Sequence, residues 1–122
     1  MPSQHPAEQL AAKKAQQEEL YQIQAEFCQG LAHPKRLLVI ASLKEGEKSV
    51  SQLAEATGIP QANLSQHLAI LRQLGILGKR RDGLNIYYSI SDERIIQACE
   101  LVNATIRQRL DKTSRILEPA RS

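Results

Sequence analysis

One stretch decides the fold of this chain: residues 49–88 have the sequence SVSQLAEATGIPQANLSQHLAILRQLGILGKRRDGLNIYY. Ser49 and Gln52 have the spacing of a capping box, in which the serine hydroxyl and the glutamine side chain each accept a hydrogen bond from a backbone N–H that is free at the start of a helix. Gly58 suits the left-handed position that ends such a helix. In the helix that follows, leucines recur at helical spacing and share one face: Leu64, Leu68, Leu71 and Leu74. Two short helices joined by a glycine-containing turn predict a helix-turn-helix at residues 49–75.

The next segment changes from helical to strand periodicity. Residues 76–90 alternate as a β-hairpin does, and the pair Asp82-Gly83 is a favourable turn. Arg80 and Arg81 stand just before that turn. We therefore expect the hairpin to form a basic wing beside the helix-turn-helix.

Amphipathic helices flank this unit on both sides. One is expected at residues 7–31, a short one follows the His33-Pro34 pair, and a last long one is expected at residues 91–117. The sequence therefore predicts a mainly α fold with a small β-hairpin, organised as a single winged-helix domain over residues 1–122.

Composition excludes several classes of protein. The chain has 122 residues, 42% hydrophobic and 24% charged, so we expect one soluble domain rather than a disordered or membrane-spanning chain. Three tyrosines, one phenylalanine and no tryptophan are too few for a platform that stacks single-stranded bases. The N-terminal residues lack the apolar core of a signal peptide, so a cytoplasmic protein without membrane contact is expected.

The charge is unevenly placed along the chain. The whole chain has a formal net charge of +3, whereas residues 31–90 hold eight basic and four acidic residues, a net charge of +4. This positive region coincides with the helix-turn-helix and the wing. It is suited to a polyanion such as double-stranded DNA.

Several motifs together resemble those of the ArsR/SmtB family of bacterial winged-helix repressors. They are HPKRLLVIASL before the unit, the ATG turn, NLSQHLAILR in the second helix, the GIL lead-in and the RDGxxxYY wing. The resemblance spans residues 20 to 110. It implies a homodimeric repressor, with the first and last helices at the dimer interface and each second helix in a major groove of operator DNA.

The resemblance also implies which residues meet DNA. In the second helix of the helix-turn-helix, the residues facing the bases would be Gln61, Ala62, Ser65 and Gln66. Asn63 and His67 would lie near them. Phosphate or minor-groove contacts would come from Arg72, Lys79, Arg80 and Arg81. Amide side chains pair with adenine edges, and guanidinium groups neutralise phosphates. Alternatives stay open: Asn63 could brace the turn, His67 could pack against the first helix, and the arginine pair could be a solvated hairpin edge.

The effector is less defined by the sequence. Residues 47–51 hold no cysteine and residues 91–122 no histidine, so the metal-ligand sets of the family are missing and we expect neither a metal site nor a cofactor. Cys28 and Cys99 lie on the first and last helices, where a disulfide, a sulfur bridge or a metalloid adduct is conceivable. The alternative is that both thiols are small buried core residues.

Three classes of function compete. The favoured one is a sequence-specific repressor released by modification of Cys28 and Cys99, by sulfur compounds or oxidants. A metalloid effector, or no small effector, is the variant within that class. A thiol oxidoreductase is disfavoured because no CxxC motif is present, so we expect no enzyme activity. The third class is an architectural protein that coats DNA without sequence preference.

Overall fold

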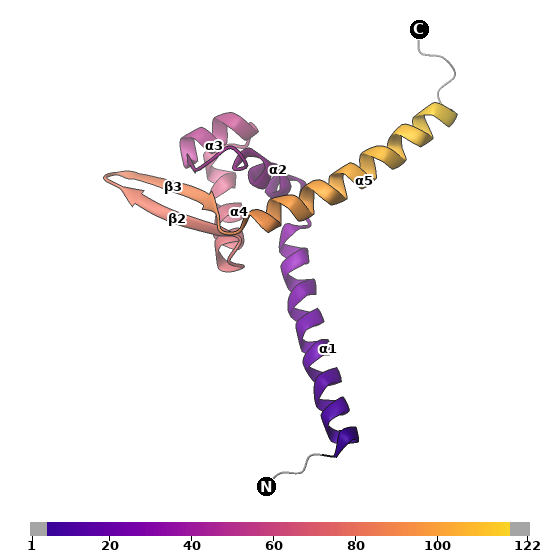
Figure 1. Ribbon diagram of the computed structural model, residues 1–122. Helices are drawn as coiled ribbons and strands as arrows, with labels where there is room; N and C mark the ends of the chain where they lie inside the picture. Colours follow the sequence, from indigo (N-terminus) through magenta and orange to yellow (C-terminus); the bar gives the residue numbers. More distant parts are fainter. Residues whose placement is uncertain (1–4, 118–122) are drawn as a thin grey trace.

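The computed structural model describes residues 5–117. In chain order, a two-residue strand precedes the helix-turn-helix, and the hairpin lies between the helix-turn-helix and the last helix. Figure 1 shows the hairpin and the last helix extending from the core. The helices are α1 (Pro6–Leu31), α2 (Pro34–Ser42), α3 (Val50–Thr57), α4 (Gln61–Gln73) and α5 (Glu93–Leu117). The strands are β1 (Lys48–Ser49), β2 (Leu77–Asp82) and β3 (Asn85–Ile90).

The start of α3 is the capping box expected from the sequence. Ser49 Oγ accepts from the backbone N–H of Gln52 at 3.2 Å, and Gln52 Oε1 accepts from the backbone N–H of Ser49 at 2.9 Å. At the other end, Gly58 has φ +73°, a conformation that costs glycine little. Both predictions are confirmed, and together they fix the length of the first helix of the helix-turn-helix.

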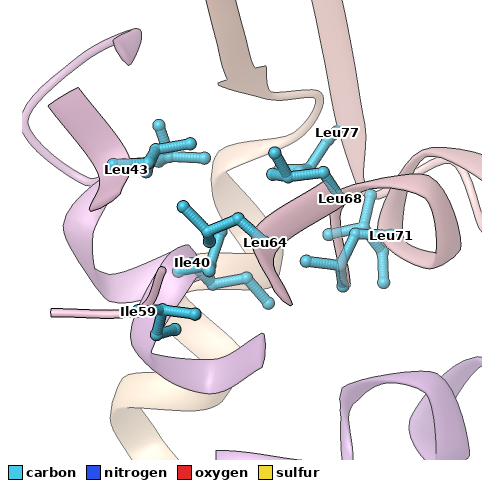
Figure 2. Close-up of a cluster of buried hydrophobic side chains, with 10 residues drawn as sticks. Ile40, Leu43, Ile59, Leu64, Leu68, Leu71 and Leu77 are labelled. Carbon is cyan, nitrogen blue, oxygen red and sulfur yellow. The ribbon is translucent and has the colours of Figure 1, made fainter. Parts of the chain in front are cut away.

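The core lies where α2, α3 and α4 meet the base of the sheet. Three leucines of the predicted stripe, Leu64, Leu68 and Leu71, are fully buried, and Leu74 is half-buried. Figure 2 shows side chains from α2, α4 and β2 gathered in one cluster. Burial of each large aliphatic side chain contributes about 1.5–3 kcal/mol. The buried set is Val39, Ile40, Leu43, Leu53, Ile59, Leu64, Leu68, Leu71, Ile76 and Leu77.

The wing differs from the expected hairpin in two ways. First, β1 pairs with β3, so the sheet has the strand order β1-β3-β2 and is antiparallel throughout. Second, Asp82 and Asn85 are paired, so the turn consists of Gly83 and Leu84 instead of Asp82 and Gly83. Gly83 adopts φ +63°, which explains why the tight turn is centred there.

The two long helices leave the core in different directions (Figure 1). No residue of α1 is buried, and only its C-terminal end, through Phe27 and Leu31, packs against the core. The base of α5 packs through Ile95 and Ile96. Over residues 5–117, none of the helices combines the length and apolar character needed to cross a membrane.

Candidate nucleic-acid interface

The accessible part of α4 presents three amides, one hydroxyl and one methyl group. Gln61, Ala62, Asn63, Ser65 and Gln66 are all exposed, whereas Leu64, Leu68 and Leu71 of the same helix are buried. Amide groups carry both donors and acceptors, which is what hydrogen bonding to base edges requires. This part of the predicted site is therefore brought together on one accessible surface.

Two of these side chains also brace the helix-turn-helix. Gln61 Nε2 donates to Ser51 Oγ of α3 at 3.3 Å, and Ser65 Oγ donates to the Gln61 carbonyl at 3.3 Å. The first contact links the two helices across the turn. Ser51 was not among the residues singled out from the sequence, because a pairing between two exposed side chains leaves no periodic signal.

His67 lies apart from this surface. It is half-buried, its Nδ1 accepts from Arg36 Nε at 3.2 Å, and its ring lies 4.7 Å from that of His33. Burial, followed by the nearby positive charges of His33, Arg36 and Lys35, lowers the pKa of His67. The side chain packs inward, as the alternative interpretation held, although its partners belong to α2 and its N-cap.

The arginines of the wing do not share one environment. Arg80 is ion-paired with Glu47 through two nitrogens, one of them Nε at 3.2 Å from Glu47 Oε2, and its guanidinium lies 4.8 Å above the Tyr87 ring. The bond from Arg80 lowers the pKa of the Glu47 carboxyl. Asp82 adds a longer contact to Arg80 at 3.8 Å. Arg80 therefore anchors the wing to the segment before β1.

Three other predicted cations are exposed. Lys79 and Arg81 alternate with Arg80 along β2, so they lie on the opposite face of the hairpin. Arg72 is exposed in the last turn of α4. Within residues 5–117, no carboxylate lies within salt-bridge distance of these three side chains. They remain available for phosphate groups.

Both cysteines line one groove between the end of α1, α2 and α5. The groove has a volume of about 1070 Å³ and mostly apolar walls, with an ion pair between Lys44 and Glu100 at 2.6 Å among its lining residues. Cys28 is exposed and Cys99 half-buried, so neither is a buried core residue within one chain. Burial, and secondarily the Cys28 thiol, raises the pKa of Cys99.

Metal ligands do not gather elsewhere in the described part of the chain. Among residues 5–117, no three side chains of histidine, cysteine, aspartate or glutamate are grouped closely enough to hold a metal ion.

Comparison with known proteins places the chain in a family. Residues 33–79 match the model of the bacterial regulatory proteins of the arsR family. An uncharacterized HTH-type transcriptional regulator of Mycobacterium tuberculosis, Rv0081, is 35% identical over 106 residues, which are 86% of this chain and 93% of the relative. The chain belongs to the ArsR family.

Further ArsR-family comparisons agree in sequence and in fold. The biofilm growth-associated repressor of Xylella fastidiosa is 41% identical over 80 residues, covering 66% of this chain and 68% of the relative. The crystal structure of Rv0081 superimposes with a TM-score of 0.70, covering 77% of this chain and 95% of that one. The homodimeric winged helix-turn-helix DNA-binding domain Mb0332 of Mycobacterium bovis is 27% identical and superimposes with a TM-score of 0.72, covering 92% and 95%.

These likenesses establish the winged helix-turn-helix fold for this ArsR-family chain. In that fold α3 and α4 are the helix-turn-helix, and β2 and β3 are the wing. Three residues that act on the predicted site residues from other elements carry no local signal of that role in the sequence: Arg36, Glu47 and Ser51. Arg36 stands within the HPKR motif, which is the one local signal that could have drawn attention to it.

Proposed function

We propose that this ArsR-family protein is a homodimeric repressor that binds a specific double-stranded operator. The observation that carries the proposal is the exposed polar face of α4, formed by Gln61, Ala62, Asn63, Ser65 and Gln66 on a helix whose other face is buried. A helix held in this way can enter a major groove, and its amides can form paired hydrogen bonds with adenine.

The wing supplies the second set of contacts. Lys79 and Arg81 of β2, with Arg72 of α4, are exposed cations that can neutralise phosphates. Arg80 takes part indirectly, because its exposed ion pair with Glu47 links the wing to the segment before β1. The proposed contacts to bases are therefore concentrated in α4, and the contacts to phosphates flank it.

Apolar side chains on the long helices support assembly of two copies. Large hydrophobic residues stay exposed along α1 and α5 within one chain, and exposed patches of this kind mark interaction surfaces. The Mb0332 domain, similar to this chain over most of its length, is described as homodimeric. On these helices the exposed residues are Leu10, Leu20, Tyr21, Ile23, Leu101, Val102, Ile106 and Leu110.

Operator binding tests the central proposal. Fluorescence anisotropy would compare the DNA upstream of the protein's own gene with scrambled DNA of equal length. We expect Gln66→Ala to reduce the preference for the upstream DNA by about 5- to 150-fold for each of the two half-sites of a homodimer, the equivalent of one paired base contact of about 1–3 kcal/mol per subunit. Gln73→Ala, at the exposed end of the same helix, is the matched control and should bind as the unmodified protein does.

Equal affinity for both DNAs would overturn the repressor proposal. If that equal binding also weakened steeply with salt, the architectural function would take its place, because non-specific binding rests on phosphate contacts. The two functions predict different results, so binding of both DNAs measured over one series of salt concentrations distinguishes them.

We further propose that modification of Cys28 and Cys99 releases the protein from DNA. Both thiols line the groove between α1, α2 and α5, where the two long helices α1 and α5 meet the core. Cys28 is the exposed member and is the first accessible to a reagent. Cys99 is half-buried and lines the same groove, so it is the second thiol of the proposed bridge.

Diamide tests this step, since it accepts two electrons and two protons from the two thiols as the sulfur–sulfur bond forms. We expect diamide to weaken operator binding by the unmodified protein and to leave Cys28→Ser and Cys99→Ser bound. An organic persulfide and arsenite, tested in parallel, separate a sulfur effector from a metalloid. If no reagent changes the affinity, thiol release is wrong while operator binding stands.

A further inference from the structure

Arg36 connects three helices although it touches neither the exposed face of α4 nor the thiols. From α2 its guanidinium donates through Nε to His67 Nδ1 of α4 at 3.2 Å and through Nη1 to the Gly30 carbonyl of α1 at 2.9 Å. Arg36 is half-buried. Its two donors therefore have fixed partners on the first helix and on the recognition helix.

The partner on α1 has a specific need for this donor. Gly30 is the next-to-last residue of α1, and the last carbonyls of a helix have no partner within the helix. They also carry the partial negative charge of the helix dipole, which favours a guanidinium. Arg36 thus satisfies the end of α1 and holds it in place.

A second contact joins the same two helices. A Cβ atom at Gly30 would lie 1.9 Å from Leu74 Cδ1, so the missing side chain is what lets α1 approach the end of α4. His67 and Leu74 are seven residues apart, about 10 Å along the helix axis. These contacts tie Gly30, at the end of α1, to two points on α4, and Phe27 and Leu31 of α1 also pack against the core. The Arg36 bridge therefore adds to the core packing in setting how α1 and α4 lie relative to each other.

We propose that Arg36 is a positioning residue that sets the angle between the recognition helix and α1 through the neutral imidazole of His67. This inference rests on the proposed function, because it assigns the angle to DNA binding. Nδ1 accepts a hydrogen bond only while it carries no proton. Protonated His67 would lose the bond and face the cation that now donates to it.

The surroundings of His67 favour the neutral form. The charged or titratable groups that act on it are His33, Lys35 and Arg36, all from α2 and its N-cap, and each disfavours a proton on the ring. The end of α1 contributes the Gly30 carbonyl, which Arg36 occupies. The link is therefore complete above the ordinary pKa of histidine and is lost as the pH falls below it.

This mechanism predicts that acidification changes operator affinity in the direction opposite to the one that simple electrostatics predicts. A proton on His67 adds a positive charge near DNA, which alone would tighten binding. If Arg36 positions α4 through the neutral ring, acidification weakens operator binding instead. The pH profile therefore separates a positioning role from a contribution to the positive field.

The test measures operator affinity of the full-length protein from about pH 7.5 to about pH 5, a range that extends well below the ordinary pKa of histidine because the pKa of His67 is lowered. We expect affinity to fall about tenfold or more on acidification, the equivalent of one lost charge-assisted hydrogen bond. His67→Asn keeps an acceptor near the Nδ1 position and cannot titrate, so it should bind tightly with a flat profile. His67→Leu, which has no acceptor, should bind weakly at every pH.

Two further variants isolate Arg36 from its charge. Arg36→Lys keeps the charge but cannot bridge both partners in the same planar geometry, and should weaken binding about tenfold at neutral pH. Lys35→Ala removes a neighbouring cation that also disfavours a proton on His67, so it should shift the midpoint of the profile slightly upward and leave the affinity at neutral pH unchanged. Operator affinity that rises or stays constant on acidification, together with full affinity in Arg36→Lys, would overturn the proposal.

A DNA-free readout keeps this inference separable from the proposed function. In NMR titrations of the unmodified protein, the Gly30 amide and Leu74 methyl signals should shift with the midpoint of His67, and they should not do so in His67→Asn. If no form bound the operator at any pH, the repressor proposal would fail. The NMR titration would then decide alone whether Arg36 couples α1 to α4, and independent midpoints would refute that coupling.

Discussion

Replacing Arg81 with alanine should reduce the salt dependence of operator binding, whereas replacing Arg80 should leave it almost unchanged. The two residues are neighbours on β2 and both are exposed. They differ in pairing, because Arg80 is held by Glu47 and lies over Tyr87. A guanidinium already paired with a carboxylate releases few counterions from DNA.

The size of the effect follows from the number of phosphates neutralised. The logarithm of the affinity falls with the logarithm of the salt concentration, with a slope of about −0.9 for each phosphate contact. A homodimer carries two wings, so Arg81→Ala should make the slope shallower by about 1.8. Between about 50 and 200 mM salt, this difference amounts to about a tenfold smaller loss of affinity.

Anisotropy titrations at five or more salt concentrations, from about 50 to 200 mM, would measure both slopes. Arg80→Ala should weaken binding at all salt concentrations alike, because the wing loses its anchor while the number of phosphate contacts stays the same. Glu47→Gln provides the complementary control, since it frees Arg80 and should steepen the slope. A slope for Arg80→Ala as shallow as that for Arg81→Ala would refute the division of roles.

Three further predictions concern stability and titration. Gly30→Ala should destabilise the fold by about 1–3 kcal/mol in urea unfolding, because its Cβ would overlap Leu74, and the cost should largely vanish in a Leu74→Ala background. Ser49→Ala should cost about 1 kcal/mol in the same assay through loss of the cap of α3, and an unchanged midpoint would contradict the capping role. The carboxyl of Asp92 accepts hydrogen bonds from the side chain and the backbone N–H of Arg94, which lower its pKa to about 2. Its contribution to stability is therefore complete above the ordinary pKa of an aspartate and is lost as the pH falls toward 2, and a carboxyl NMR titration with a midpoint near the ordinary value of 3.8 would contradict this.

Local patterns in the sequence were sufficient to predict the helix-turn-helix. The capping box at Ser49, the left-handed Gly58 and the leucine stripe of α4 all follow from spacings of three or four residues, and the structure confirms each. The strand β1 could not be predicted, because its two residues have no periodicity and gain their structure only by pairing with β3. The turn position differed by one residue because both Asp82-Gly83 and Gly83-Leu84 contain the required glycine.

The candidate site was predictable only where it depends on a single element. The exposed face of α4 follows directly from its buried face. In contrast, Arg80 pairs with a carboxylate 33 positions away, and His67 pairs with a guanidinium 31 positions away. A sequence pattern carries no signal for such pairs, so the wing arginines appeared equivalent and His67 appeared to belong to the outer face of α4. The contacts of these residues with DNA remain predictions.

The sparse packing of α1 within one chain links the stability of this helix to the amount of protein in the cell. It is 26 residues long and only its C-terminal end packs against the core of its own chain, so the part of the helix before Phe27 is marginally stable in water on its own. The folded fraction of this arm should therefore follow the law of mass action and rise with the number of copies present. A newly made or diluted chain would expose a frayed arm to proteases, whereas a chain above the association threshold would be protected. The copy number itself thereby becomes a control on how much regulator survives, independent of any chemical signal.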